Sequence, residues 1–216
     1  MYEAKSKEII LRRIREALAK PAPFLPQTPD SNTPLHAPPG DDLSVIFAQN
    51  FIRNAGVFLY CESEEDFYDQ LYLFKKEKNL QNLYVWEPEL KQKLNAAGIL
   101  FTGTEDDFLK NAEASLTSCE SLIARTGSIF VSSANAGGRR LSIYPVIHLV
   151  VAYASQLMFN IKDGIKALQQ KYQNKLPSMV SLVSGPSRTA DIEKTLVTGA
   201  HGPKQIVLFF IDDQAH

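Results

Sequence analysis

The chain has 216 residues, of which 44% are hydrophobic and 22% are charged, a composition that suits one large globular domain with its own core. The net charge of -1 does not give the positive electrostatic potential that attracts a nucleic-acid backbone. Two cysteines, Cys61 and Cys119, are too few for a disulfide framework and lack the spacing of a metal or iron–sulfur site, so we expect no metal or cofactor in this chain. No apolar run reaches the roughly 20 residues of a membrane span, and the first residues lack the apolar core of a signal peptide, so we expect a cytoplasmic protein.

The N-terminal segment, residues 1–20, is predicted to form an amphipathic helix. Within Lys5–Ala19 apolar residues recur at helical spacing, and the arginines fall largely on the other face. Seven prolines follow in residues 21–40, which predicts an extended linker. The apolar stripe of the helix must then pack on residues 41–216, which we expect to form a single domain, or on another subunit.

From residue 41 onward, predicted helices and strands alternate. The helices are expected at about Asp42–Arg53, Glu64–Lys76, from Pro88 onward, Glu105–Asn111, Cys119–Leu122, Lys162–Lys171 and Thr189–Val197. The strands are expected at about Gly56–Tyr60, Asn82–Trp86, Ile99–Thr102, Ser128–Ser132, Val146–Ala152, Met179–Val183 and Gln205–Ile211. Strands that are apolar on both faces and separated by helices predict an α/β fold with a mainly parallel sheet covered on both sides. In such sheets ligands bind beyond the carboxyl ends of the strands.

The segment Ser184–Pro203 carries the strongest signal for a binding site. Gly185 ends a predicted strand, and Ser187, Arg188 and Thr189 fall in the first turn of the predicted helix that follows. Free backbone N–H groups at a helix N-terminus attract anions, so this turn predicts a bound phosphate or carboxylate. Helix capping alone accounts for the serine, but it leaves the arginine and threonine beside a glycine unexplained.

Three other positions are weaker candidates. The turn Arg125, Thr126, Gly127 and Ser128 exposes N–H groups that suit a ligand. Arg140 follows a glycine pair, where a guanidinium group can bind an anion, although the spacing alone slightly favours a solvated hairpin tip. His201 lies in a loop that Gly202 and Pro203 constrain, which makes it a candidate acid or base. His148 lies within an apolar run, where a histidine is more often a hydrogen-bonded core residue than a general base.

Several of these blocks together resemble a known family. The turn at Arg125–Ser128, the run Arg139–His148 (RRLSIYPVIH) and the blocks SGPSRTADIE and GAHGP within Ser184–Pro203 are similar, in order and separation, to LUD-domain proteins of the lactate utilization protein C type. The resemblance covers nearly the whole chain, including the opening helix. It implies the three-layer α/β/α fold shared with sugar-phosphate isomerases and CoA transferases (NagB/RpiA/CoA transferase-like).

The same resemblance implies a role in bacterial use of L-lactate. The chain would be an accessory subunit that binds a small anion and assembles with iron–sulfur partner subunits, which oxidise L-lactate to pyruvate. Many relatives carry glutamate where this chain has Arg125, and threonine where it has Ser128. The arginine inverts the charge at that position, so an acid–base role there does not carry over, whereas anion binding is favoured.

Two alternatives remain open at this level. The chain would in one case be a stand-alone enzyme of the isomerase, CoA-transferase or cyclo-ligase type, acting on a phosphorylated or CoA-linked substrate. In the other case it would be a ligand-sensing regulatory module in which occupancy of the Gly185 loop repositions the N-terminal helix. A homo-oligomer formed through that helix is a further expectation.

Overall fold

The structure is a computed structural model, which describes residues 2–19, 40, 42–106, 108–134, 139–173, 175–192, 195–199 and 201–214. The chain divides into two units, residues 1–37 and residues 38–216. The first unit contains helix α1 (Tyr2–Leu18), at the position of the predicted N-terminal helix. Its isoleucines at positions 9, 10 and 14 are 45%, 57% and 48% exposed. Apart from Gly40, the predicted linker lies outside the described residues.

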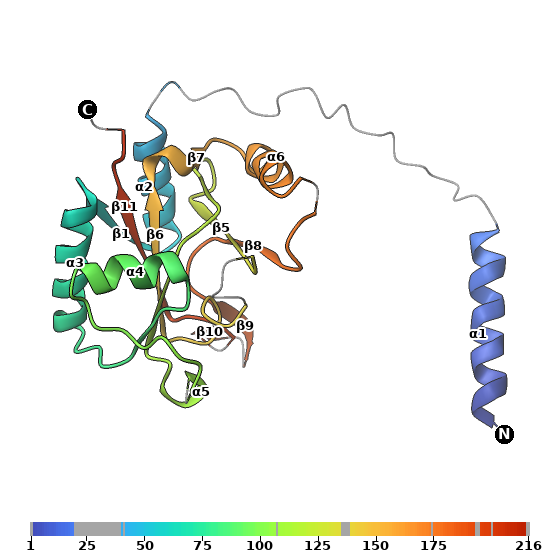
Figure 1. The fold of residues 1–216 in the computed structure, drawn as a ribbon. Coiled ribbons are helices and arrows are strands. Elements are labelled where there is room, and N and C mark those ends of the chain that lie inside the picture. The colour runs from blue at the N-terminus through green and yellow to red at the C-terminus, as the bar shows by residue number, and fades with distance from the viewer. Residues whose placement is uncertain are drawn as a thin grey trace. The chain divides into compact units, whose positions relative to one another are not determined.

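The second unit is built on a five-stranded sheet, which we call the main sheet. Its strands run in the order β1-β11-β6-β3-β2 and all adjacent pairs are parallel (Figure 1). They comprise β1 (Val57–Cys61), β2 (Leu83–Tyr84), β3 (Ala114–Thr117), β6 (Ile147–Tyr153) and β11 (Gln205–Ile211). The central strands are apolar on both faces, as expected for a parallel sheet covered on both sides. The predicted α/β class is therefore confirmed.

Two helices cover one face of the main sheet. They are α3 (Glu64–Glu77) and α4 (Pro88–Ala96), and they pack on alternate residues of the central strands, including Leu149 and Phe209. Each helix begins where the sequence predicts. The hydroxyl of Ser63 accepts a hydrogen bond from the N–H of Asp66 at 3.2 Å, and a proline opens α4.

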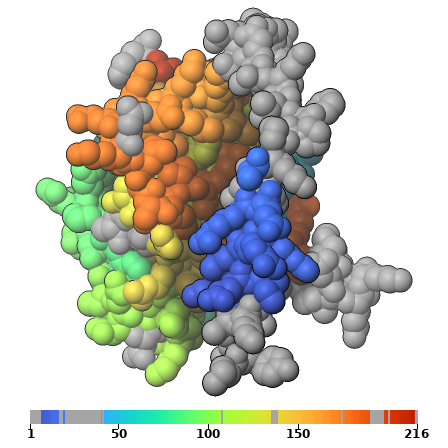
Figure 2. Space-filling view, turned by 90° about the vertical axis from the view of Figure 1, so that its right-hand side faces the viewer, coloured from blue at the N-terminus to red at the C-terminus, as the bar shows by residue number. Residues whose placement is uncertain are grey.

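The other face of the main sheet meets helix α2 (Leu43–Arg53) and a second, four-stranded sheet. This small sheet has the order β7-β4-β5-β8. Its strands are β4 (Ser121–Ile123), β5 (Ser128–Ser132), β7 (Leu157–Met158) and β8 (Val180–Val183). Phe47 and Phe51 of α2 join Leu122, Ile129 and Leu208 in one core cluster. Helix α6 (Ile161–Lys171) packs on the outer face of the small sheet through Leu168; Figure 2 shows this side of the molecule, with residues after about 150 in orange.

The remaining elements are short. They are α5 (Phe108–Asn111), the 3-10 turn η1 (Ala154–Gln156) and an antiparallel hairpin formed by β9 (Arg188–Ile192) and β10 (Thr195–Thr198). Among the residues described, no helix is both long and apolar enough to cross a membrane.

The structure contradicts three of the predicted elements and shortens a fourth. The segment predicted as a helix at Thr189–Val197 is the β9–β10 hairpin, and the one predicted at Cys119–Leu122 leads into strand β4. The predicted strand Ile99–Thr102 makes only one isolated bridge, between Thr102 and Tyr84, and the helix predicted at Glu105–Asn111 is limited to α5. Strand β3 was not predicted. The hairpin sequence is rich in β-branched residues, whose crowded side chains favour strands over helices.

Candidate functional site

The C-terminal end of α2 gathers two of the loops that the sequence singles out. The side-chain amide of Asn50 donates to the carbonyl of Ala124 at 2.9 Å, and that of Asn54 donates to the carbonyl of Thr126 at 2.8 Å. These bonds fix the turn Arg125–Ser128 against the helix. The hydroxyls of Ser128 and Ser184 lie 2.6 Å apart, which connects that turn to the end of β8.

Two glycines allow this close approach. Gly127 has a φ of 57°, and a Cβ atom there would lie 2.3 Å from the backbone nitrogen of Phe51. Gly185 has a φ of 105°, and its Cβ would lie 2.2 Å from the carbonyl oxygen of Asn54. Both positions therefore require glycine for backbone conformation and for space. The glycines in the two sequence motifs are explained by packing against α2.

Arg188 contacts the same helix end. Its Nη2 atom donates to the carbonyl oxygen of Asn54 at 3.3 Å. A cation here complements the partial negative charge of a helix C-terminus. The helix N-terminus on which the predicted anion site depended is absent, because Arg188 and Thr189 begin the β9–β10 hairpin. Anion binding at these residues therefore stays a prediction, without that physical basis.

The two ends of the Ser184–Pro203 segment lie next to each other. The N–H of Ser187 donates to the carbonyl of Pro203 at 3.0 Å, and the N–H of Gly199 donates to the carbonyl of Ser187 at 2.8 Å. His201, between these contacts, is exposed. Ser187 and the loop that contains His201 thus lie together at the base of the β9–β10 hairpin.

The remaining predicted arginines lie in different places. The Nε atom of Arg125 donates to the side-chain oxygen of Asn160, immediately before α6, at 2.9 Å. Arg140 instead pairs with Glu105 at 2.9 Å and lies over the ring of Trp86. The structure therefore brings residues 125–128, Gly185 and Arg188 together, and it does not bring Arg140 to them.

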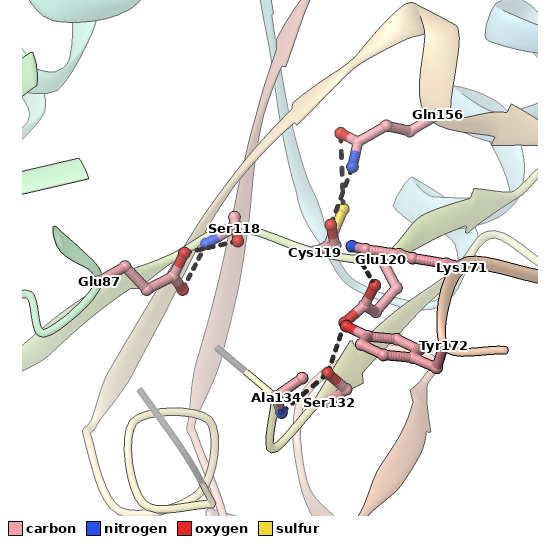
Figure 3. A network of polar contacts seen from close by, with 9 residues as sticks. All are labelled: Glu87, Ser118, Cys119, Glu120, Ser132, Ala134, Gln156, Lys171 and Tyr172. Carbon is pink, nitrogen blue, oxygen red and sulfur yellow. Dashed lines mark hydrogen bonds and ion pairs between the residues drawn. The ribbon is translucent and has the colours of Figure 1, made fainter. Parts of the chain in front are cut away.

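A group of polar side chains around two buried carboxylates was not predicted from the sequence. This carboxylate cluster consists of Glu87, Ser118, Glu120, Ser132, Lys171 and Tyr172 (Figure 3). Glu87 follows β2 and is 7% exposed. One of its carboxylate oxygens accepts from the Ser118 N–H at 3.0 Å and the other from the Ser118 hydroxyl at 2.6 Å. Burial raises the pKa of the Glu87 carboxyl above its ordinary value, although these two hydrogen bonds oppose the change.

Glu120 is the second carboxyl group of the cluster, and its side chain is only 1% exposed. It accepts hydrogen bonds from Lys171 Nζ at 2.8 Å, from the Tyr172 hydroxyl at 2.7 Å and from the Ser132 hydroxyl. Burial alone would raise the pKa of Glu120, but these donors outweigh it and hold the pKa below its ordinary value. The Glu87 and Glu120 carboxyl groups thus have pKa values shifted in opposite directions, each through its own hydrogen-bond partners.

The two cysteines are structural residues. Cys61 is fully buried in the core between the main sheet and α3, whereas Cys119, which is 4% exposed, belongs to the core on the opposite face. Burial raises the pKa of the Cys61 thiol to about 12 and also raises that of Cys119. Neither thiol is activated as a nucleophile. Within the described part of the chain, no three His, Cys, Asp or Glu side chains are grouped so that they could hold a metal ion.

Comparisons with known proteins agree with this architecture. The chain is 32% identical over 109 residues to Lactate utilization protein C 1 of Bacillus mycoides, a match that covers 50% of this chain and 47% of that protein. It is 27% identical to Uncharacterized protein YkgG of Escherichia coli over 94% of this chain and 96% of that protein. The chain thus spans about half the length of the Bacillus relative and of other relatives named Lactate utilization protein C.

A solved structure and a family match complete the comparison. The crystal structure of a DUF162 family protein from Deinococcus radiodurans shares the fold, with a TM-score of 0.58 and 19% identity over 78% of this chain and 96% of that one. The LUD domain family matches residues 90–211, more than half of the chain. This segment contains β3 to β11, the two arginine-bearing loops at α2 and most of the carboxylate cluster. The chain belongs to the LUD domain family.

Proposed function

We propose that this protein is a lactate utilization protein C-like subunit, which acts in the cytoplasm with iron–sulfur partner proteins that oxidise L-lactate to pyruvate. The observation that carries the proposal is the family match together with several relatives named Lactate utilization protein C. The YkgG relative, which aligns over nearly its whole length, supports a chain of this overall organisation.

The cysteines support a role that does not include electron transfer by this chain. An iron–sulfur cluster is usually held by four cysteine thiolates. This chain has two cysteines, and they lie on opposite faces of the main sheet. The clusters that the proposed oxidation needs would therefore be in partner subunits, and the exposed apolar stripe of α1 is a candidate surface for docking them.

The proposed contribution of this chain is the binding of a small carboxylate anion. The backbone carbonyl of Arg125 lies at the C-terminal end of α2, whereas its guanidinium group contacts Asn160; the guanidinium group of Arg188 contacts the carbonyl of Asn54 at that helix end. Each guanidinium group has five N–H donors, of which the contacts described above use one. The carbonyl end of α2 repels an anion. Binding therefore depends on the two guanidinium groups, which can hold a carboxylate through charge-assisted hydrogen bonds.

This dependence predicts the behaviour of the double variant Arg125→Gln/Arg188→Gln. Loss of two charge-assisted hydrogen bonds should weaken L-lactate binding at least roughly tenfold, as measured by calorimetry or by the shift in melting temperature. Arg139→Gln is the matched control, because Arg139 bonds to Ser178 instead of to α2. Equal binding by the double variant and the control would contradict this anion site.

A second function is favoured by one observation. Glu87 and Glu120 have pKa values shifted in opposite directions, which suits acid–base catalysis by the chain itself. The corresponding activity would be that of an isomerase, CoA transferase or cyclo-ligase. Turnover of a phosphorylated or CoA-linked substrate by the isolated chain would support this function over an accessory role.

A further inference from the structure

Three polar residues lie together on one face of two central strands. Ser115 and Thr117 are on β3, and His148 is on β6 directly opposite Ser115. Their exposed fractions are 0%, 7% and 0%. The intervening residue Leu116 belongs to the core beneath α3 and α4, so the three polar side chains point to the opposite face of the sheet. Polar groups in strands buried on both faces are costly, so such a group calls for a functional explanation.

The hydrogen bonds of these residues leave one atom without a partner. The hydroxyl of Ser115 donates to the carbonyl of Leu141 at 2.6 Å, and the hydroxyl of Thr117 lies 2.8 Å from Nε2 of His148. Within the described part of the chain, Nδ1 of His148 has no hydrogen-bond partner, although it is buried. An unpaired buried polar atom lowers the stability of the folded protein. A ligand atom at Nδ1 would remove that cost.

The imidazole is uncharged at neutral pH. Burial lowers the pKa of His148 to about 4, so one ring nitrogen carries a hydrogen and the other a lone pair. The hydroxyl of Thr117 can donate to Nε2 or accept from it. Nδ1 can therefore act as a donor in one tautomer and as an acceptor in the other, with no movement of heavy atoms.

We propose that Nδ1 of His148, supported by Thr117, binds the C2 oxygen of a small 2-hydroxy or 2-oxo acid. This choice of ligand class rests on the proposed function in lactate oxidation. The oxygen at C2 is a hydroxyl in the 2-hydroxy acid and a carbonyl in the 2-oxo acid. The former can donate to the lone pair of Nδ1, and the latter can only accept from its N–H. The two tautomers of the His148–Thr117 pair match both members of this redox couple. Because the ring is fully enclosed, ligand entry requires a local opening of the structure around it.

The double variant Thr117→Val/His148→Leu tests this site. It replaces both hydrogen-bonding partners with apolar groups, so the protein should fold and be at least as stable as the unmodified chain. Binding of pyruvate and of L-lactate, measured by calorimetry, should weaken at least roughly tenfold, since a site that hydrogen-bonds its ligand discriminates strongly. Propanoate, which lacks the C2 oxygen, is the matched ligand, and its binding should be the same in both proteins.

Nitrogen NMR of the unmodified chain tests whether Nδ1 of His148 binds the ligand, even if the double variant does not fold. Pyruvate should shift the His148 signals toward the tautomer with hydrogen on Nδ1, and propanoate should leave them unchanged. If a water molecule alone occupies Nδ1, no acid will move these signals, and the inference is wrong. This outcome would refute only the His148 site. The proposed function is tested separately, by growth of bacteria on L-lactate with the unmodified chain.

Discussion

Replacing Gly127 with alanine is expected to lower the free energy of unfolding by about 3 kcal/mol or more, the sum of a conformational and a steric cost. The residue has a φ of 57°, which disfavours any side chain. The added Cβ would also lie 2.3 Å from the nitrogen of Phe51 and 2.4 Å from the carbonyl carbon of Asn50. These are backbone atoms of α2, so relief requires the helix or the turn to move.

Gly98→Ala is the matched control for this variant. Gly98 has a similar φ of 69°, but a Cβ there meets no atom within 4 Å. Its replacement should cost about 1 kcal/mol, the conformational contribution alone. Urea unfolding followed by circular dichroism measures both values. Equal losses would show that the turn at Arg125–Ser128 does not pack tightly against α2.

Lys171→Met is expected to destabilise the protein by about 2 kcal/mol at pH 8, less than a fully buried ion pair because the Lys171 side chain is 57% exposed. The variant leaves the carboxylate of Glu120 buried without its cation. In the unmodified protein the lowered pKa of Glu120 gives stability that is present above its ordinary pKa and is lost as the pH falls through the lowered value. The difference in stability between the variant and the unmodified protein should therefore shrink as the pH falls below about 4.5.

Lys166→Met, at an exposed position on the same helix, is the control. It should change the free energy of unfolding by no more than about 0.5 kcal/mol at either pH. Adding Glu120→Gln to Lys171→Met should remove most of the pH dependence. A loss in Lys171→Met that is the same at pH 4 and pH 8 would mean that the lysine acts through packing and not through the charge of Glu120.

The main sheet was predictable because its signals are local. Strand β11 agrees with its predicted bounds, since a run of apolar residues follows a Gly-Pro turn. Helices α3 and α4 begin at a serine cap and at a proline, both readable from the sequence. Strand β3 was missed because its small polar residues, Ser115 and Thr117, face inward where apolar residues are expected.

The arrangement of the site depends on contacts between distant residues, which local patterns do not contain. Gly127 and Gly185 were recognised as turn residues, but the reason for them is an approach to α2, more than seventy residues earlier for Gly127. Glu120 and Lys171 are separated by 51 residues, and nothing near either of them signals a buried ion pair. The turn residues of the Ser184–Pro203 segment suggested a helix start, whereas its β-branched residues form a hairpin.

The most direct test of the proposed function is growth on L-lactate. A bacterial strain that lacks its own lactate utilization protein C, but retains its iron–sulfur partner proteins, should not grow with L-lactate as the sole carbon source. Expression of this chain should restore growth, and the Arg125→Gln/Arg188→Gln variant, produced at the same level, should restore it poorly. Absence of rescue by the unmodified chain, with the protein folded and present in the cells, would contradict a role in lactate utilization.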